Sequence, residues 1–317
     1  MTPPRRSSGL RLCRLRRVSV PLVVGVAVAF GCALAALGGC GHGAREAREP
    51  AAAGGAAGGP RRIISLAPSL SETLFALGLG GRVVGVDDYT AWPPEVAGKA
   101  RLGGLIDPNL ERIVSLRPDL AVVLPSEREV AGKLDRLGIA TLTVRTDTLD
   151  DVERGFRLIA RRCGVAAAGE RLAARWRAAL APRPVPGSPR VMLSIDRQRG
   201  RLAGILAAAR GTFYDELLGR LGAINVFADA ATPYPQVGLE EVVARAPEAI
   251  LELRAAPASA GLAAALAGDW RRLGALPAVR NGRIEVIAGD FVSVPGPRLP
   301  LLYQRMRQAL GARRTRP

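Results

Sequence analysis

Beyond residue 60, short apolar runs alternate with stretches that have the spacing of amphipathic helices. The apolar run of residues 63–67 ends at Pro68, and Ser69 and Glu72 follow it with the spacing of a capping box that begins a helix. Another apolar run, residues 83–87, comes after that helix. Strand, helix and strand in succession predict an α/β unit.

The same alternation continues to residue 310 and predicts an α/β protein. The expected strands cover residues 63–67, 83–87, 120–124, 139–144, 190–196, 249–253 and 283–287. The expected helical segments cover residues 69–77, 93–97, 109–116, 127–137, 149–180 with a break at Gly164, 213–221, 239–245, 261–276 and 299–310. A helix of about 15 residues spans roughly 22 Å, so the second part of 149–180 is long enough to bridge two lobes as a stiff rod.

One pattern occurs twice, at an offset of 129 residues. Residues 110–119 and residues 239–248 share Leu and Glu, then Ile-Val or Val-Val one position later, then Pro and an acidic residue. A repeat in each half of the chain predicts two similar lobes. Ligands of open α/β sheets bind outside the carboxyl ends of the strands, so we expect a ligand cleft between the lobes.

The N-terminal segment has the pattern of an export signal. Six arginines precede an apolar run, residues 18–37, and Leu37-Gly38-Gly39-Cys40 follows. Leucine three positions before a cysteine resembles the cleavage site of bacterial lipoproteins. We therefore interpret residues 1–39 as a lipoprotein signal peptide and Cys40 as the lipidation site, in preference to a retained membrane helix, plain secretion or twin-arginine export. Residues 40–60 are rich in Ala, Gly, Arg, Glu and Pro and predict a flexible tether.

Charge, cysteine and histidine usage then exclude several kinds of chemistry. The net charge is +17, but the basic residues are almost all scattered arginines, which disfavours nucleic acid as a partner of an exported chain. Cys163 is the only cysteine beyond Cys40, so the folded part has no internal disulfide, and we interpret Cys163 as a buried spectator. The single histidine, His42, lies in the tether, which excludes Ser-His triads, histidine bases and histidine-based metal sites from the folded part.

Several motifs resemble those of periplasmic substrate-binding proteins of ABC importers, in the class whose two lobes are joined by a helical backbone. The similarity covers residues 61–310 and is nearest to the cobalamin-binding receptors. It rests on Arg62 to Ser69 with Glu72, Val84 to Val86 with Tyr89 and Trp92-Pro93-Pro94, Asn109 to Val114, Tyr234 to Val237 with Glu240, and Gly289-Asp290-Phe291 with Pro297-Arg298.

This resemblance implies two α/β lobes joined by a single long backbone helix, with a ligand cleft between them and no catalysis. The N-terminal lobe would cover residues 61–148, the helical connection 149–185 and the C-terminal lobe 186–317. The protein would be a monomer, anchored by lipid on the periplasmic side of the cell envelope. Its partners would be a small-molecule ligand and an ABC permease dimer with its ATPase subunits.

A corrinoid is a flat, largely apolar macrocycle fringed with amides, so its receptor needs aromatic faces and a few polar groups. Aromatic residues make up only 4% of the chain, yet four of them fall on expected cleft loops. Together with one acid they form the candidate ligand set: Tyr89, Trp92, Tyr234, Asp290 and Phe291. The best-known cobalamin receptors have tryptophans where this chain has Leu105 and Leu124, and an arginine where it has Val294.

Glu111 and Glu240 occupy equivalent places in the repeat, each in the first turn of an expected helix. A carboxylate there is favoured by the helix dipole alone. The resemblance implies a second role, because glutamates at these positions dock onto arginines of the two permease subunits. The repeat favours docking, since a receptor with two similar lobes that meets a twofold partner needs one anion on each lobe.

Other interpretations stay open. Haem would need a tyrosine ligand, and Tyr89 or Tyr234 could supply it. A ferric siderophore is a further alternative within the class, whereas free transition-metal ions are disfavoured by the lack of histidine. An exported enzyme that uses Asp87, Asp88 and Asp290, or a purely structural lipoprotein, represents other classes, but no motif spacing supports either. No resident cofactor or metal is expected.

Overall fold

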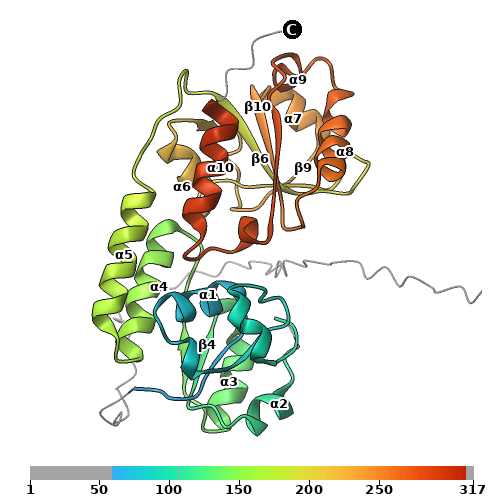
Figure 1. Ribbon diagram of the computed structural model, residues 1–317. Helices are drawn as coiled ribbons and strands as arrows, with labels where there is room; N and C mark the ends of the chain where they lie inside the picture. The colour runs from blue at the N-terminus through green and yellow to red at the C-terminus, as the bar shows by residue number, and fades with distance from the viewer. Residues whose placement is uncertain (1–58, 106, 312–317) are drawn as a thin grey trace, which may run out of the picture. The chain divides into compact units, whose positions relative to one another are not determined.

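The computed structural model describes residues 59–105 and 107–311, which form two α/β lobes (Figure 1). The signal peptide, lipidation site and most of the tether predicted from the sequence lie outside these residues. Of the described part of the chain, no helix has the length and apolar character needed to cross a membrane.

The first lobe is built on a parallel sheet of five strands in the order β3-β2-β1-β4-β5. The strands are β1 Ile63–Ser65, β2 Val83–Val86, β3 Ala100–Arg101, β4 Leu120–Val123 and β5 Thr141–Thr143. Parallel neighbours place all their carboxyl ends at one edge of the sheet. We call this sheet with its helices the N-lobe.

The second lobe, the C-lobe, has a mixed sheet in the order β11-β10-β6-β7-β9, with β8 paired to β6. Its strands are β6 Arg190–Asp196, β7 Ile205–Ala207, β8 Ile224–Asn225, β9 Gln236–Val237, β10 Ala249–Arg254 and β11 Ile284–Ala288. β7 runs antiparallel to both β6 and β9. The sequence pattern predicted the three long parallel strands but not the short strands β7, β8 and β9.

Helices account for most of the remaining chain. In the N-lobe they are α1 Pro68–Ala76, α2 Leu110–Ser115 and α3 Arg128–Arg136, and the connection contains α4 Leu149–Arg162 and α5 Ala166–Ala179. In the C-lobe they are α6 Phe213–Arg220, α7 Leu239–Arg245, α8 Ala260–Arg271, α9 Pro277–Arg280 and α10 Leu299–Gly311. Short 3₁₀ turns are η1 Gly80–Arg82, η2 Pro94–Gly98, η3 Pro125–Glu127 and η4 Asp290–Ser293.

Buried strands carry apolar residues on both faces, because helices cover both sides of each sheet. Along β1, Ile63 packs into one core with α1, α4 and α5, and its neighbour Ile64 packs into another with α2 and α3. Along β6, Val191 and Met192 alternate in the same way, with α6 and α10 on one side and α7, α8 and α9 on the other. The core of Ile63 also contains Val191, so one continuous core extends from the N-lobe through α4 and α5 into the C-lobe.

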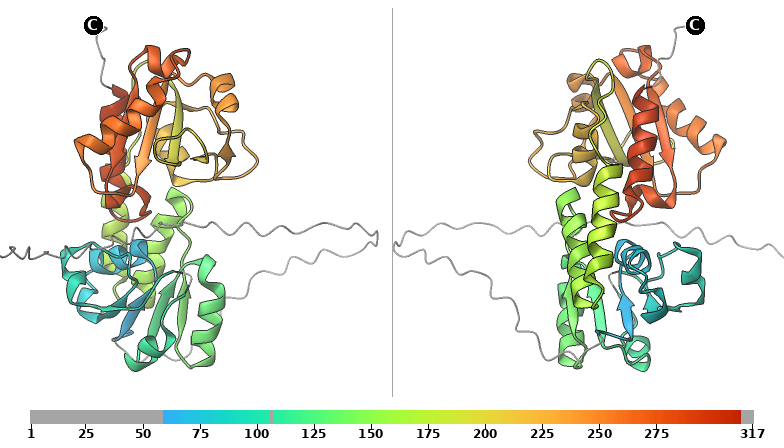
Figure 2. Two further views of the ribbon diagram at one scale, coloured as in Figure 1. Left: turned by 90° about the vertical axis from the view of Figure 1, so that its right-hand side faces the viewer. Right: turned by 60° about the vertical axis from the view of Figure 1, so that its left-hand side comes forward.

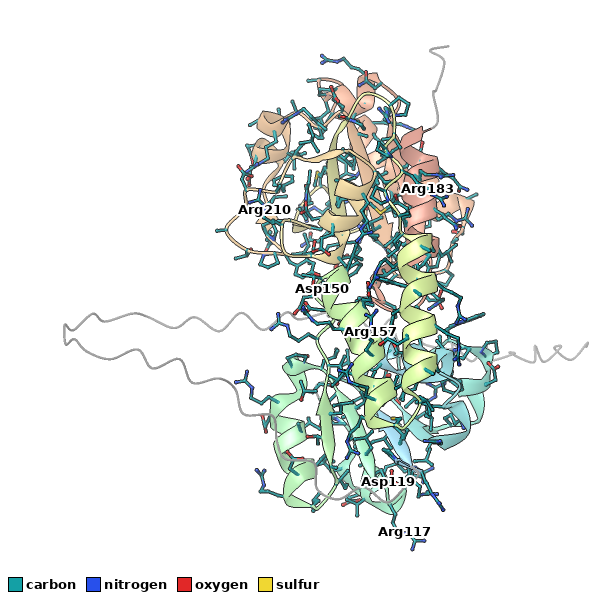
Figure 3. The ribbon with its side chains drawn as sticks, turned by 90° about the vertical axis from the view of Figure 1, so that its left-hand side faces the viewer. Arg117, Asp119, Asp150, Arg157, Arg183 and Arg210 are labelled. Carbon is teal, nitrogen blue, oxygen red and sulfur yellow. The ribbon has the colours of Figure 1, made fainter. Side chains whose placement is uncertain are left out.

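The connection between the sheets consists of two helices packed side by side (Figure 2). Gly169 on α5 permits this packing, because a Cβ there would lie 2.5 Å from Ala160 of α4. Arg157, labelled in Figure 3, lies on α4. It binds Glu170 on α5 and Glu153 on its own helix. The predicted break at Gly164 is present, with φ of 74°.

Contacts at its ends show that α5 spans from one lobe to the other. The residue that ends α4, Cys163, accepts a hydrogen bond from Arg82 of the N-lobe at its carbonyl oxygen. Beyond the other end of α5, the carbonyl of Leu180 accepts from Arg220 and that of Ala181 from Tyr303, both in the C-lobe. Helix α5 therefore corresponds to the segment predicted to bridge the lobes. It does so together with α4, whose first residue, Leu149, donates its backbone N–H to Glu216 on α6, so the connection is not a single helix.

The internal repeat corresponds to equivalent helix–strand units, α2–β4 and α7–β10. From Glu111 to Leu116 and from Glu240 to Arg245, each pair of repeat positions has the same degree of burial. The equivalent residues Arg117 and Ala246, which follow the two helices, both have a left-handed φ of 46°.

The capping box expected at Ser69 and Glu72 is wrong. Helix α1 begins at Pro68 with Ala67 as its N-cap and no side-chain cap. The ring of Pro68 sets φ for the first helical turn and needs no hydrogen-bond partner for its nitrogen. Glu72 is buried and forms an ion pair with a residue of the other lobe instead.

Candidate functional site

The loop after β2 carries two exposed aromatic residues on a rigid base. Asp87 is fully buried, and its carboxylate accepts hydrogen bonds from the backbone N–H of Tyr89 at 2.8 Å and from the hydroxyl of Thr90. Arg101 on β3 donates to the carbonyl oxygens of Asp87 and Thr90. This base holds Tyr89 and Trp92 at the carboxyl edge of the N-lobe sheet, where 55% and 44% of their surfaces are exposed. Burial raises the pKa of the Asp87 carboxyl.

The turn after β11 presents Asp290 and Phe291 from the C-lobe. Asp290 is exposed, whereas Phe291 is half-buried against the core shared by the lobes. Tyr214 on α6 fixes this turn, because its buried hydroxyl donates to the carbonyl oxygen of Val292 at 3.0 Å. Burial strongly raises the pKa of the Tyr214 hydroxyl, which therefore stays a donor.

Tyr234 lies on an extended segment beside β7. The carbonyl oxygens of its neighbours Pro233 and Pro235 accept hydrogen bonds from Ala209 and Ala207, both at 2.9 Å. These bonds fix the backbone on both sides of Tyr234, whose ring packs half-buried against the shared core. Burial raises the pKa of its hydroxyl to about 12, and the negative charge of Asp147 contributes in the same direction.

Arg298 connects these groups across the lobes. Its guanidinium binds both carboxylate oxygens of Glu72 on α1, with 3.0 Å from Nε to Oε2. The same guanidinium binds both carboxylate oxygens of Asp290 at 3.0 Å. Its central carbon lies 5.3 Å from the ring centroid of Trp92, within the range of a cation–π contact. One arginine therefore holds an acid from each lobe and an aromatic face.

A hydrogen bond from the connecting helix α5 to the C-lobe fixes the segment that carries Arg298. The indole nitrogen of Trp176 on α5 donates to the carbonyl oxygen of Gly296, two residues before Arg298, at 3.1 Å. A cavity of about 230 Å³ lies beside Arg298 and has walls from both lobes. It is lined by Glu72, Phe75, Ala76, Trp92, Pro93, Glu95, Pro297 and Arg298.

The structure brings together only some of the residues predicted to hold a ligand. Trp92 and Asp290 are neighbours of one guanidinium, and Tyr234 and Phe291 both pack against the shared core. Tyr89 forms no hydrogen bond or ring contact with this guanidinium in the described structure. It lies beside Gly104, and a Cβ atom added to Gly104 would be 3.6 Å from the Tyr89 hydroxyl. How these side chains contact a ligand stays a prediction.

Sequence reasoning gave Glu72 only a capping role, missed Tyr214 and gave Arg298 no role. The Glu72–Arg298 pair joins positions 226 residues apart, and no local spacing announces such a contact. Tyr214 occupies an ordinary buried position of an amphipathic helix, so its sequence context predicts core packing. The sequence motif Pro297-Arg298 was recognised, but it does not indicate that Arg298 binds Glu72 and Asp290.

Glu127 is a buried acid at the carboxyl end of β4. Its Oε2 accepts a hydrogen bond from the backbone N–H of Leu124 at 2.7 Å, while its buried Oε1 has no hydrogen-bond partner among the residues that the structure describes. Burial raises the pKa of this carboxyl to about 8, and repulsion by the Asp87 carboxylate adds to the shift. The protonated acid therefore predominates at neutral pH.

Glu111 and Glu240 lie where the repeat predicted them, exposed in the first turns of α2 and α7. The predicted N-cap of α2 is confirmed, because the side chain of Asn109 accepts a hydrogen bond from the N–H of Arg112 at 2.8 Å. The docking role of the two glutamates stays a prediction.

Comparison with known proteins gives a consistent set of relatives. Residues 63–290 match the family described as periplasmic binding protein. The vitamin B12-binding protein of Vibrio cholerae serotype O1 is 30% identical over 241 residues, which cover 75% of this chain and 84% of that protein.

Solved structures with the same architecture are named for the binding of different ligands. The crystal structure of the periplasmic vitamin B12-binding protein of Vibrio cholerae is similar with a TM-score of 0.66 and 28% identity, and covers 79% of this chain and 96% of its own. The apo periplasmic heme-binding protein of Roseiflexus sp. RS-1 is similar with a TM-score of 0.67 and 27% identity, and covers 80% of this chain and 98% of its own.

Proposed function

We propose, from the premise that this chain belongs to the periplasmic binding protein family, that it captures a corrinoid between its lobes and delivers it to an ABC permease. Proteins of this family bind small molecules and pass them to ABC transporter permeases, so the chain is a binding protein rather than an enzyme. The corrinoid, the site residues, the lipid anchor and the docking surface are the parts that we propose.

The observation that carries the proposal is the position of Arg298. This arginine lies against Trp92 of the N-lobe and binds Asp290 of the C-lobe, so two residues expected to grip a ligand from opposite lobes share one neighbour. Tyr89 and Trp92 offer exposed aromatic faces at the edge where the N-lobe strands end. Ligands bind at this edge of α/β sheets, and aromatic faces suit a broad apolar ring.

The choice of a corrinoid rests on the relatives and on the residue types. A likeness to a vitamin B12-binding protein over three quarters of the chain supports a ligand of that chemical class. The proposed set combines aromatic faces with one exposed acid, Asp290. Its carboxylate accepts hydrogen bonds from Arg298 and has further lone pairs that can accept hydrogen bonds from the amide side chains of a corrinoid. The set is Tyr89, Trp92, Tyr234, Asp290 and Phe291.

Haem is the second candidate, and Tyr234 is the observation that favours it. A half-buried phenol held on a fixed backbone is a suitable ligand for ferric iron. The structural likeness to a heme-binding protein of comparable identity supports the same alternative. A ferric siderophore is the third candidate, because ligands of all three kinds are broad and partly apolar.

The remaining parts of the proposal concern location and partners. The sequence before Cys40 supports export and lipidation of that cysteine, which would anchor the protein on the periplasmic side of the cell envelope as a monomer. Glu111 and Glu240 would each bind a cation on one subunit of the permease dimer. Both acids are exposed on equivalent helices, as docking requires.

Spectroscopy combined with titration tests the ligand. The full chain, purified in detergent from its natural source, is expected to have the visible spectrum of a cobalt corrinoid or to acquire it with cyanocobalamin. Calorimetric titration then compares cyanocobalamin, haemin and a ferric siderophore. Tight binding of haemin without binding of cyanocobalamin would overturn the corrinoid assignment and leave the importer-receptor function standing.

A further inference from the structure

Two exposed valines occupy equivalent places in the two lobes. Val114 on α2 and Val243 on α7 are related by the same 129-residue offset as Glu111 and Glu240. Each valine is 44% exposed and lies three positions after its glutamate. Residues three apart on a helix are neighbours on its surface, so each lobe presents an acid beside an aliphatic side chain.

A single exposed valine carries no information, because isolated apolar residues are common on protein surfaces. The shared fold explains why Ile113 and Val242 are both buried, since these side chains pack into the cores beneath α2 and α7. It does not explain apolar residues at the next, exposed positions. Valine is also a weaker helix former than the polar residues that usually occupy such positions. The recurrence of an unfavourable residue at both sites is the observation that needs an explanation.

The C-lobe acid also borders a groove. Glu240 lines an open depression of about 550 Å³ whose walls are the turn Leu202, Ala203 and Gly204 and the segment from Gln236 to Leu239. The chain before this turn is held firmly, because the buried guanidinium of Arg197 donates to the carbonyl oxygens of Gln198 and Arg201 and forms ion pairs with Glu252 and Asp269. A protruding loop of a partner that reaches Glu240 would therefore meet a preformed surface.

We propose that Val114 and Val243 form the apolar half of two equivalent docking patches, Glu111 with Val114 and Glu240 with Val243. The partner that fits them is the twofold permease dimer, each subunit of which would present a cation beside aliphatic side chains. This inference rests on the docking role proposed above and extends it to a chemical description of the partner's surface. Two equal patches on one chain match two equal subunits.

Charge alone does not account for a stable complex. An exposed ion pair strengthens binding by about fivefold at most, because water competes for both charges. Aliphatic contacts beside the pair exclude that water and add affinity through the apolar surface they bury. The glutamates would then select the partner and steer association, and the valines would slow dissociation.

Site-directed photocrosslinking in cells of the natural source tests the contact. A benzophenone-bearing residue replaces Val114 or Val243 in the full chain, and the same residue at Leu137 serves as control. Leu137 is 54% exposed and has no counterpart in the repeat. Both valine positions are expected to trap the same polytopic permease subunit, identified by mass spectrometry, and Leu137 is expected to trap none. Adducts with unrelated proteins, or with none, would overturn the inference.

Paired substitutions supply a quantitative test. Val114→Thr with Val243→Thr keeps the shape and β-branching of both side chains but replaces a methyl by a hydroxyl, and is expected to lower complex formation with the permease about tenfold in total. Leu137→Thr is the matched control and should leave it unchanged. If the charge-reversed glutamates abolish docking while the threonine pair behaves like the control, the valine inference fails and the glutamate role stands. If neither pair has an effect, the docking surface itself is wrong.

Discussion

Glu72 on α1 and Arg298, the residue before α10, form an ion pair that joins the two lobes. The guanidinium of Arg298 binds both carboxylate oxygens, and Glu72 is almost fully buried. Burial raises the pKa of the Glu72 carboxyl, while the neighbouring guanidinium acts in the opposite direction. A buried acid of this kind is tolerable only while its partner stays in place.

Arg298→Ala should therefore destabilise the protein. Removing the guanidinium leaves Glu72 buried without a counter-ion and frees Asp290 and Trp92, at an expected cost of about 2 to 4 kcal/mol in the free energy of unfolding. Urea denaturation followed by circular dichroism measures it. Arg307→Ala is the control, because Arg307 lies on α10, the helix that follows Arg298, and is exposed. A loss no larger than that of the control would show that the pair contributes nothing to stability.

The buried acid Glu127 predicts a dependence of stability on pH. Because its pKa of about 8 in the folded state exceeds the ordinary value, its contribution is fully present below about pH 4.5 and is lost as pH rises through about 8. A shift of this size corresponds to about 5 kcal/mol over that window. Glu127→Gln keeps an acceptor for the N–H of Leu124 and removes the titration.

The measurement is the unfolding free energy of both proteins between about pH 5 and pH 9. The parent should lose stability relative to Glu127→Gln as pH rises. Glu129→Gln, at a neighbouring but exposed acid, should follow the parent. Parallel curves for the parent and Glu127→Gln would mean that Glu127 titrates as an ordinary exposed acid.

The long elements could be predicted from the sequence because their apolar spacing is regular. Residues 190–196 and 239–245 have the predicted bounds, and the break at Gly164 is present. The short strands β7 and β9 could not be predicted, because each exists through antiparallel pairing with a distant segment rather than through its own pattern. The capping role predicted for Glu72 was wrong for the same reason. Its carboxylate binds Arg298, a partner 226 residues away that the local capping spacing does not indicate.

The site was predictable only in part. Motif likeness located Trp92 and Asp290 without indicating that one arginine lies between them. Tyr214, which holds the turn after β11, has nothing in its sequence context that separates it from other core residues. Local motifs thus identify the loops of the cleft, and the long-range contacts that fix those loops follow only from the fold.

Anchoring is tested at Cys40. Lipid attachment needs the cysteine sulfur, so Cys40→Ser should abolish lipid labelling and signal cleavage at that site. Because the folded lobes begin after residue 60, the unfolding temperature should not change. Metabolic labelling with a radioactive fatty acid and fractionation of membranes measure the first effect. Labelled, membrane-bound Cys40→Ser protein would contradict the assignment.

Docking is tested by charge reversal. Glu111→Lys with Glu240→Lys should reduce transport and complex formation at least tenfold, because each lysine would face a cation of the permease. Ligand affinity should stay within about twofold, since both glutamates are exposed and lie outside the proposed ligand set. Glu129→Lys with Glu170→Lys, at two exposed acids, provides a control of equal charge change. If transport equals that of the control, the docking role is wrong and both glutamates act only as charges at the helix ends.

Ligand binding should depend on the aromatic faces of both lobes. Loss of an aromatic platform costs about 0.5 to 1.5 kcal/mol beyond the buried area, so Trp92→Ala or Tyr234→Ala should weaken cyanocobalamin binding about tenfold. The pair together should weaken it further, because the two side chains come from different lobes. Isothermal titration gives the affinities, and the unfolding temperature of each variant controls for a general loss of structure.

Conservative changes at the tyrosines separate stacking from iron ligation. Stacking needs only the ring, so Tyr234→Phe and Tyr89→Phe should bind cyanocobalamin nearly as well as the parent. Ligation of haem iron needs the phenolate oxygen, so one of these variants would lose the iron-to-phenolate absorption band and much of its haemin affinity. The raised pKa of Tyr234, about 12, means that only a bound metal would ionise it near neutral pH. Release of a proton on haemin binding, absent in Tyr234→Phe, would thus identify Tyr234 as an iron ligand and exclude stacking as its role.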